Sequence, residues 1–171
     1  RLATVEDMPL DEWDRTIALN LRSVFLMSRA AIPHLKKSKA GRIINVASIS
    51  GRAVTVASSP AYGSAKAAVI QLTRFLAQQL GPDGVTANAI APITTLTPRV
   101  KALRTDEDVA RIAALVPLRR LAVSEDHANA ILREARDDAG EQPGRSREQG
   151  GRRDHPDGEP RGDSHGARLH V

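Results

Sequence analysis

Residues 48–66 read S-I-S-G-R-A-V-T-V-A-S-S-P-A-Y-G-S-A-K. Tyr62 is the only tyrosine of the chain, and Lys66 follows it by four residues. If a helix starts near Tyr62, the two side chains lie one turn apart on the same face. A nearby ammonium group stabilises a phenolate, so it would lower the pKa of Tyr62 from the usual value of about 10. A tyrosine tuned in this way can exchange a proton with a carbonyl or an alcohol, and the hydroxyl of Ser48 could hold the same oxygen.

Taken alone, the Tyr-x-x-x-Lys pattern is a weak motif, because exposed helices carry such pairs by chance. On the motif alone, an ordinary helix surface is the better interpretation. A functional hypothesis therefore depends on the segments that flank the motif.

The composition limits the classes of protein to which the chain can belong. Its 171 residues correspond to one domain or part of one. The absence of cysteine excludes disulfides and thiolate metal sites, and no metal site is expected from the irregularly spaced histidines of the tail. No apolar run reaches the roughly 18 residues that a membrane span needs, so we expect no membrane contact and a cytoplasmic protein. The net charge of +5 does not indicate nucleic-acid binding, because the tail mixes both signs and lacks aromatic residues to stack on bases.

The hydrophobic pattern predicts an α/β fold. Amphipathic stretches predict helices at residues 11–37 and 62–80, and short apolar blocks predict strands at 42–47 and 85–91 that are buried on both faces. Shorter helices are expected from 105 or 106 to 116 and from 125 to about 136. A strand–helix–strand crossover implies parallel strands, whose carboxyl ends gather ligand-binding groups at one edge. Ser48 and residues 92–97 follow those ends, and a helix that starts near Tyr62 reaches the same edge.

Beyond residue 140 the apolar periodicity ends. Residues 141–171 are rich in Gly, Pro, Arg and Asp, so we expect a disordered polar tail. A shift of reading frame near residues 133–141 is one hypothesis for this change. A gene sequence that restores an apolar strand in another frame would support it, and an uninterrupted frame in related genes would oppose it.

Five segments occur in order along residues 5–139: W-D-R-T-I-A-L-N-L, G-R-I-I-N-V-A-S-I-S-G, Y-G-S-A-K-A-A-V, V-T-A-N-A-I-A-P and P-L-R-R-L-A-V-S-E-D-H-A-N-A-I-L. In sequence and order they resemble the short-chain dehydrogenase/reductase family. The resemblance implies hydride transfer between NAD or NADP and a small carbonyl or alcohol substrate. It also implies that the chain is a C-terminal two-thirds fragment with an atypical tail.

The resemblance assigns a role to each matching residue. Tyr62 would be the general acid/base, and Lys66 would lower its pKa and hold the nicotinamide ribose. Ser48 would bond the substrate oxygen, and Asn20 would hold a water molecule of a proton relay. These four residues would form the catalytic tetrad.

The cofactor would lie against Tyr62 and Lys66 and against the segment that begins at Pro92. Thr95 would bring its backbone beside the nicotinamide ring, and Thr97 would contact the carboxamide. The sequence departs from the family pattern at two places that bear on the cofactor. It has no glycine-rich phosphate loop, and Ile93 stands where the family has glycine.

The fold expected from the resemblance is an incomplete Rossmann-like, doubly wound parallel sheet that lacks its N-terminal strands. Residues 1–140 would form a partial NAD(P)-binding domain. The alternative function is a non-catalytic remnant of the family that acts at most as an interaction module. Either form could associate as a homo-oligomer through the helices at 11–37 and 62–80.

Overall fold

A computed structural model describes residues 3–55, 58–136 and 169–170. Its elements alternate between helices and short strands, as the sequence predicts. In chain order they are α1 (Leu10–Ile17), the π-helical segment η1 (Ala18–Arg22), α2 (Ser23–Leu35), β1 (Arg42–Val46), the 3₁₀ turn η2 (Ile49–Gly51), α3 (Pro60–Leu80), η3 (Gly81–Asp83), β2 (Thr86–Ile90), α4 (Pro98–Leu103), α5 (Asp106–Ala114), α6 (Ser124–Ala135) and β3 (Leu169–His170).

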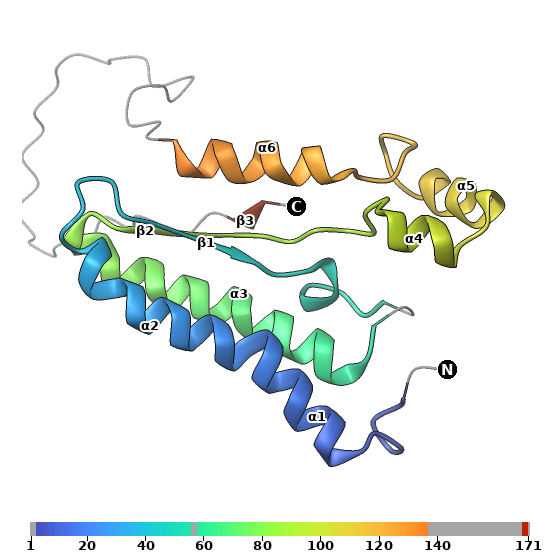
Figure 1. Cartoon of the computed structure of the whole chain (residues 1–171), viewed down its shortest axis with the longest axis horizontal. Coiled ribbons are helices and arrows are strands. Elements are labelled where there is room, and N and C mark those ends of the chain that lie inside the picture. The colour runs from blue at the N-terminus through green and yellow to red at the C-terminus, as the bar shows by residue number, and fades with distance from the viewer. Residues whose placement is uncertain (1–2, 56–57, 137–168, 171) are drawn as a thin grey trace, which may run out of the picture.

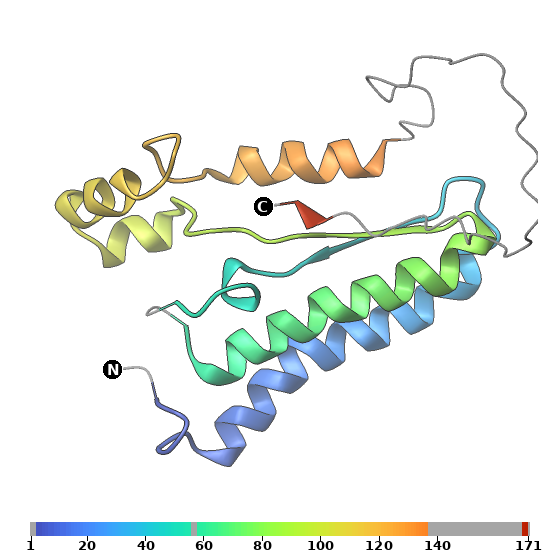
Figure 2. The ribbon, with the colours of Figure 1, turned by 180° about the vertical axis from the view of Figure 1, so that it is seen from behind.

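The strands form one parallel sheet in the order β1-β2-β3. β1 and β2 pair in register from Arg42 opposite Thr86 to Val46 opposite Ile90. Figures 1 and 2 show α2 and α3 on one face of the sheet, with α1 continuing the rod of α2, and α6 on the other face. The predicted α/β fold with an incomplete parallel sheet is therefore confirmed.

The main core lies between the sheet and the α2–α3 layer. Ile43 of β1 and Ala87 of β2 are buried against the second half of α3, where Leu76 and Leu80 close the cluster. In β1 the buried residues on this side are Ile43 and Asn45, and in β2 they are Ala87 and Ala89. Because side chains alternate between the two faces of a strand, these residues share the face that points to the helices. Burial of this apolar surface is what holds α3 against the sheet.

A hydrogen-bonded polar pair lies within this layer. Asn45 of β1 donates its side-chain amide to the hydroxyl of Thr73 on α3 over 2.8 Å, and both residues are buried. The Thr73 hydroxyl in turn donates to the carbonyl of Val69, one turn back in the same helix. The pair fixes the position of α3 along β1, because either partner without the other would leave a buried polar group unpaired.

The opposite face of the sheet is less covered than expected. Ile44 is half-buried, and Val46 keeps 48% of its surface exposed. The prediction that this strand is buried on both faces was therefore wrong for β1. The physical reason is that α6 alone packs on this face of the described structure, whereas both α2 and α3 pack on the other.

The helix predicted over residues 11–37 is not a regular α-helix. It starts at Leu10 and widens into the π-helical segment η1, where the N–H of Ser23 donates to the carbonyl of Ala18, five residues back. α2 then runs through Pro33 and ends two residues later at Leu35. The helical rod is continuous in Figure 1, and the wide turn takes up one extra residue within it.

The expected tail at residues 141–171 lies outside the described residues, apart from Leu169–His170. These two residues form β3 and pair with Ala89 and Ile90 of β2. Within the described part of the chain, no helix has the length and hydropathy needed to cross a bilayer. The same residues hold no cluster of three His, Asp or Glu side chains that could bind a metal ion.

Candidate active site

The turn that follows β1 presents Ser48 at the carboxyl end of the strand. Ser48 is buried, and its Oγ accepts a hydrogen bond of 3.2 Å from the backbone N–H of Ser50. This bond starts the 3₁₀ turn η2. It uses an acceptor site of the hydroxyl, so the O–H hydrogen of Ser48 can still be donated to another oxygen.

Gly51 lets this turn lie directly on α3. A Cβ at residue 51 would be 2.6 Å from the carbonyl carbon of Lys66 and 2.7 Å from the nitrogen of Ala67. These are backbone atoms, which cannot rotate away as a side chain can. The glycine therefore sets the distance between the Ser48 turn and the helix that carries Tyr62.

α3 begins just before Tyr62, as the sequence predicts. Ser59 caps the helix by accepting the backbone N–H of Tyr62 over 3.3 Å, and Pro60 occupies the first helical position. Both residue types are favoured at these places, because the cap satisfies a free N–H and proline has none to satisfy. The start of the helix holds Tyr62 half-buried near the edge of the sheet.

Lys66 lies one turn further along α3 and connects Tyr62 with β1. Its Nζ is 5.6 Å from the centroid of the Tyr62 ring and donates a 2.9 Å hydrogen bond to the carbonyl of Val46. Burial lowers the pKa of Lys66 from its ordinary value of 10.5. The ammonium group is thus held near the aromatic ring by a backbone carbonyl two residues before Ser48.

The segment that follows β2 lies beside this turn. The backbone N–H of Ile49 donates to the carbonyl of Pro92 over 3.0 Å. Further along, the N–H of Leu96 donates to the carbonyl of Ala122 over 2.7 Å, and Thr97 accepts the N–H of Val100 to cap α4. Residues 92–97 therefore border the same carboxyl edge as Ser48.

Asn20 lies on the neighbouring helical rod. Its side-chain amide donates 3.0 Å to the carbonyl of Thr16, which in a regular α-helix would accept the backbone N–H of residue 20. Leu21, next to it, packs against the buried cluster of Ala47 and Val69. The structure thus brings Ser48, Tyr62 and Lys66 to one edge and positions Asn20 on an element that packs against α3.

Sequence reasoning missed His127, which lies in the first turn of α6 and reaches the segment after β2. Its Nε2 is 2.7 Å from the Oγ1 of Thr95. The sequence shows a histidine in the first turn of a predicted helix, but it gives no local signal that identifies the partner of this side chain. His127 and Thr95 are 32 residues apart in the sequence, so no local pattern could identify Thr95 as the partner.

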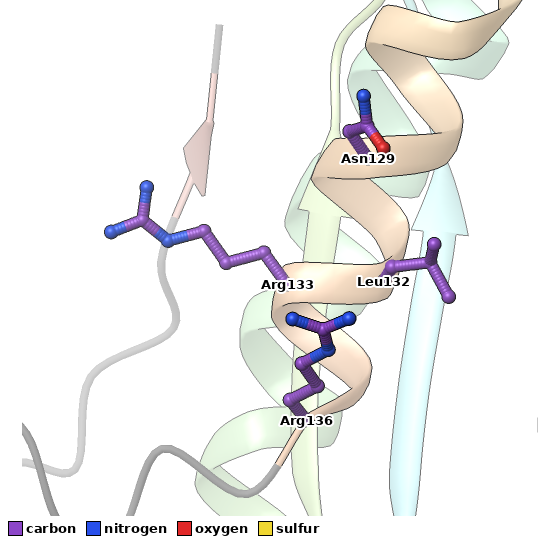
Figure 3. Close-up of a pocket in the computed structure, with 4 residues that line it drawn as sticks. All are labelled: Asn129, Leu132, Arg133 and Arg136. Carbon is purple, nitrogen blue, oxygen red and sulfur yellow. The ribbon is translucent and has the colours of Figure 1, made fainter.

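Two cavities lie away from this edge. One of about 370 Å³ is lined by Asn129, Leu132 and Arg133 of α6 and by Arg136 just after the helix. Figure 3 shows Arg133 and Leu132 projecting on opposite sides of the helix. The other, about 360 Å³, lies between α2 and β1 and includes Met27 and Ile43. Neither is lined by Tyr62 or Lys66.

Comparison with known proteins shows which proteins the chain is similar to. The family model described as Enoyl-(Acyl carrier protein) reductase matches residues 2–144. The chain is 36% identical over 129 residues to a probable galactose dehydrogenase of Rhizobium meliloti (strain 1021), covering 75% of this chain and 50% of that protein. It is 45% identical over 97 residues to a D-beta-hydroxybutyrate dehydrogenase of the same organism, covering 57% of this chain and 37% of the relative.

Solved structures show the same relationship. A 3-oxoacyl-[acyl-carrier protein] reductase with bound NAD from Brucella melitensis superposes with a TM-score of 0.70 at 30% identity, covering 78% of this chain and 48% of that one. A second such reductase, from Brucella melitensis ATCC 23457, gives a TM-score of 0.73 at 32% identity, covering 78% and 50%. The chain thus spans about half the length of the structures it matches.

Proposed function

Because the chain belongs to the short-chain dehydrogenase/reductase family, we propose that it carries the proton-transfer site of an NAD(P)-dependent oxidoreductase that interconverts a small carbonyl compound and an alcohol. The observation that supports this most is the position of the Lys66 ammonium group, 5.6 Å from the Tyr62 ring and anchored on the carbonyl of Val46. This places a cation beside the aromatic ring of the proposed proton donor. The neighbouring Ser48 hydroxyl supplies a second group for the same substrate oxygen.

In the reduction, the Tyr62 phenol donates its proton to the carbonyl oxygen as that oxygen gains negative charge. The Ser48 hydroxyl donates a hydrogen bond to the same oxygen and so stabilises the developing charge. In the oxidation, the same two groups act in reverse, and Asn20 holds the water molecule through which the proton reaches solvent. The nicotinamide, when bound, supplies or accepts the hydride.

The residues of the described structure suit the nicotinamide end of the cofactor. Lys66 uses one of its three N–H donors on Val46, which leaves donors for the hydroxyls of a ribose. The segment with Pro92, Thr95 and Thr97 borders the same edge, and we assign it to the nicotinamide ring and its carboxamide. The sequence contains no G-x-G-x-x-G motif for the phosphates, so the proposal leaves the choice between NAD and NADP open.

We further propose that residues 1–140 act as part of a larger NAD(P)-binding domain and that the protein works in the cytoplasm. The proposal of a larger domain is supported by the relatives, of which the chain covers about half. Their names include a sugar dehydrogenase, a hydroxy-acid dehydrogenase and acyl-carrier-protein reductases, so they support a small-molecule substrate without selecting one.

The test is a titration of the full chain with NADH and NADPH, followed by nicotinamide fluorescence, and an assay of carbonyl reduction. Tyr62→Phe removes one oxygen atom and should abolish most of the activity while leaving the circular dichroism spectrum unchanged. Lys66→Met should lower both activity and cofactor affinity, whereas Lys37→Met, which changes an exposed lysine, should affect neither. Full activity of Tyr62→Phe would refute the assignment, and a folded wild-type chain that binds neither cofactor would favour a non-catalytic remnant.

A second proposal is association of two copies through the helices at 11–37 and 62–80. Large apolar side chains are exposed there, including Phe25 at 46%, Met27 at 71% and Phe75 at 50%. Exposed apolar clusters of this kind often mark contact surfaces. Sedimentation should show a dimer that Met27→Glu weakens, while Leu115→Glu, at an equally exposed position after α5, leaves it intact.

A further inference from the structure

His127 joins two segments that are far apart in the sequence. It lies in the first turn of α6, and its Nε2 is 2.7 Å from the Oγ1 of Thr95 in the segment after β2. Both side chains are partly buried, so water competes only in part for this hydrogen bond. The contact crosses from the helix on one face of the sheet to the edge where the candidate site lies.

The direction of this hydrogen bond follows from a count of protons. The Oγ1 of Thr95 is also 3.0 Å from the carbonyl oxygen of Ile93, which can only accept. A threonine hydroxyl has one hydrogen and two acceptor sites. Both contacts are satisfied when the hydroxyl hydrogen goes to Ile93 and the hydroxyl oxygen accepts from His127. The Nε2 of His127 must then carry a hydrogen.

The first turn of α6 is itself firmly fixed. The carboxylate of Asp126 accepts the backbone N–H of Val123 over 2.9 Å and pairs with both terminal nitrogens of Arg120, at 2.6 and 2.9 Å. The carbonyl of Ala122 accepts the N–H of Leu96. His127 therefore extends from a well-fixed helix start toward a loop whose backbone also pairs with Ala122, in a parallel bridge at Thr95.

We propose that His127 is a positioning residue that holds the loop of residues 93–97 through an Nε2–H hydrogen bond to Thr95. His127 acts through Thr95 and does not itself touch the reacting atoms. Its importance for the reaction rests on the proposed function, because Thr95 and Thr97 are the proposed nicotinamide contacts. Loss of the bond leaves the loop held to this helix start by the backbone pairing at Ala122, so we expect the loop to open more often.

Three variants of the full chain separate the hydrogen bond from the bulk of the side chain. The amide nitrogen of Gln can occupy the place of the histidine Nε2, whereas the amide of Asn is too short to reach it. His127→Gln should therefore keep the bond, and His127→Asn and His127→Leu should lose it. Because one such bond contributes about 1 kcal/mol, the amide of Leu96 should exchange its hydrogen roughly 3- to 10-fold faster in the last two variants.

The second readout is the tautomer of His127. Nitrogen NMR at about pH 8, where an ordinary histidine is neutral, should find the hydrogen on Nε2. A hydrogen on Nδ1 would overturn the proposal, as would equal exchange at Leu96 in His127→Gln and His127→Asn. Both readouts are independent of the cofactor. If the wild-type chain shows the expected tautomer and exchange but binds no nicotinamide, the proposed function fails and the positioning role stands.

Discussion

Replacement of Gly51 by alanine tests the close contact on which the geometry of the site depends. The added Cβ would lie 2.6 Å from the Lys66 carbonyl carbon and 2.7 Å from the Ala67 nitrogen, well inside normal contact distance. Since both atoms belong to the backbone of α3, the 3₁₀ turn η2 or the start of the helix must move. Overpacking of this kind costs about 1–3 kcal/mol. For a chain of 171 residues, this corresponds to a midpoint of thermal unfolding lower by about 2–12 °C.

The assay is urea unfolding followed by circular dichroism, together with thermal unfolding of the same samples. Gly81→Ala is the matched control, because Gly81 has a helical backbone and nothing lies within 4 Å of a Cβ built there. This control should be neutral or stabilising by up to about 1 kcal/mol, since alanine restricts the unfolded chain more than glycine does. If Gly51→Ala is no less stable than Gly81→Ala, the close contact between η2 and α3 does not exist as described.

Three further predictions concern the polar groups of the fold. Thr73→Val should cost about 1–3 kcal/mol because it leaves the buried Asn45 amide without its acceptor. In urea unfolding, addition of Asn45→Leu should restore part of that loss, and strict additivity would count against the pair. The lowered pKa of Lys66 means that the folded chain releases this proton before the unfolded chain does, so stability should rise with pH in the window below 10.5. Urea midpoints between about pH 8 and 10 should rise less steeply in Lys66→Met than in wild type. The Arg120 guanidinium holds the pKa of Asp126 well below its usual range, so this stabilisation is present above about pH 4 and is lost as the pH falls further. Thermal midpoints should therefore fall less on acidification in Asp126→Asn than in wild type.

The elements around the site could be predicted because each has a strong local signal. The apolar block before Ser48 predicts a strand, and the amphipathic stretch at 62–80 predicts a helix that starts near Tyr62, so the edge of the sheet follows from their order. The four-residue spacing then gives the common face of Tyr62 and Lys66. These signals lie within one or two turns of the residues they position.

The features that the sequence could not predict depend on distant partners. The hydrogen bond from Lys66 to the Val46 carbonyl forms because α3 packs across β1. The hydrogen bond between His127 and Thr95 forms because α6 packs beside the segment after β2. The half-exposed face at Val46 was missed because an apolar run does not reveal how many helices will cover it. β3 was missed because a two-residue strand has no period of its own to detect.

The π-helical segment η1 holds one more residue per turn than the α-helices on either side of it. Removal of one residue there, for instance the 64% exposed Leu19, would convert the segment to α-helix and leave α2 facing the sheet as before. Elsewhere in the same rod, a deletion would rotate everything beyond it by about 100° and turn the apolar side away from the sheet. Related chains can therefore differ in length at this one turn of the rod without loss of packing, and that turn carries Asn20.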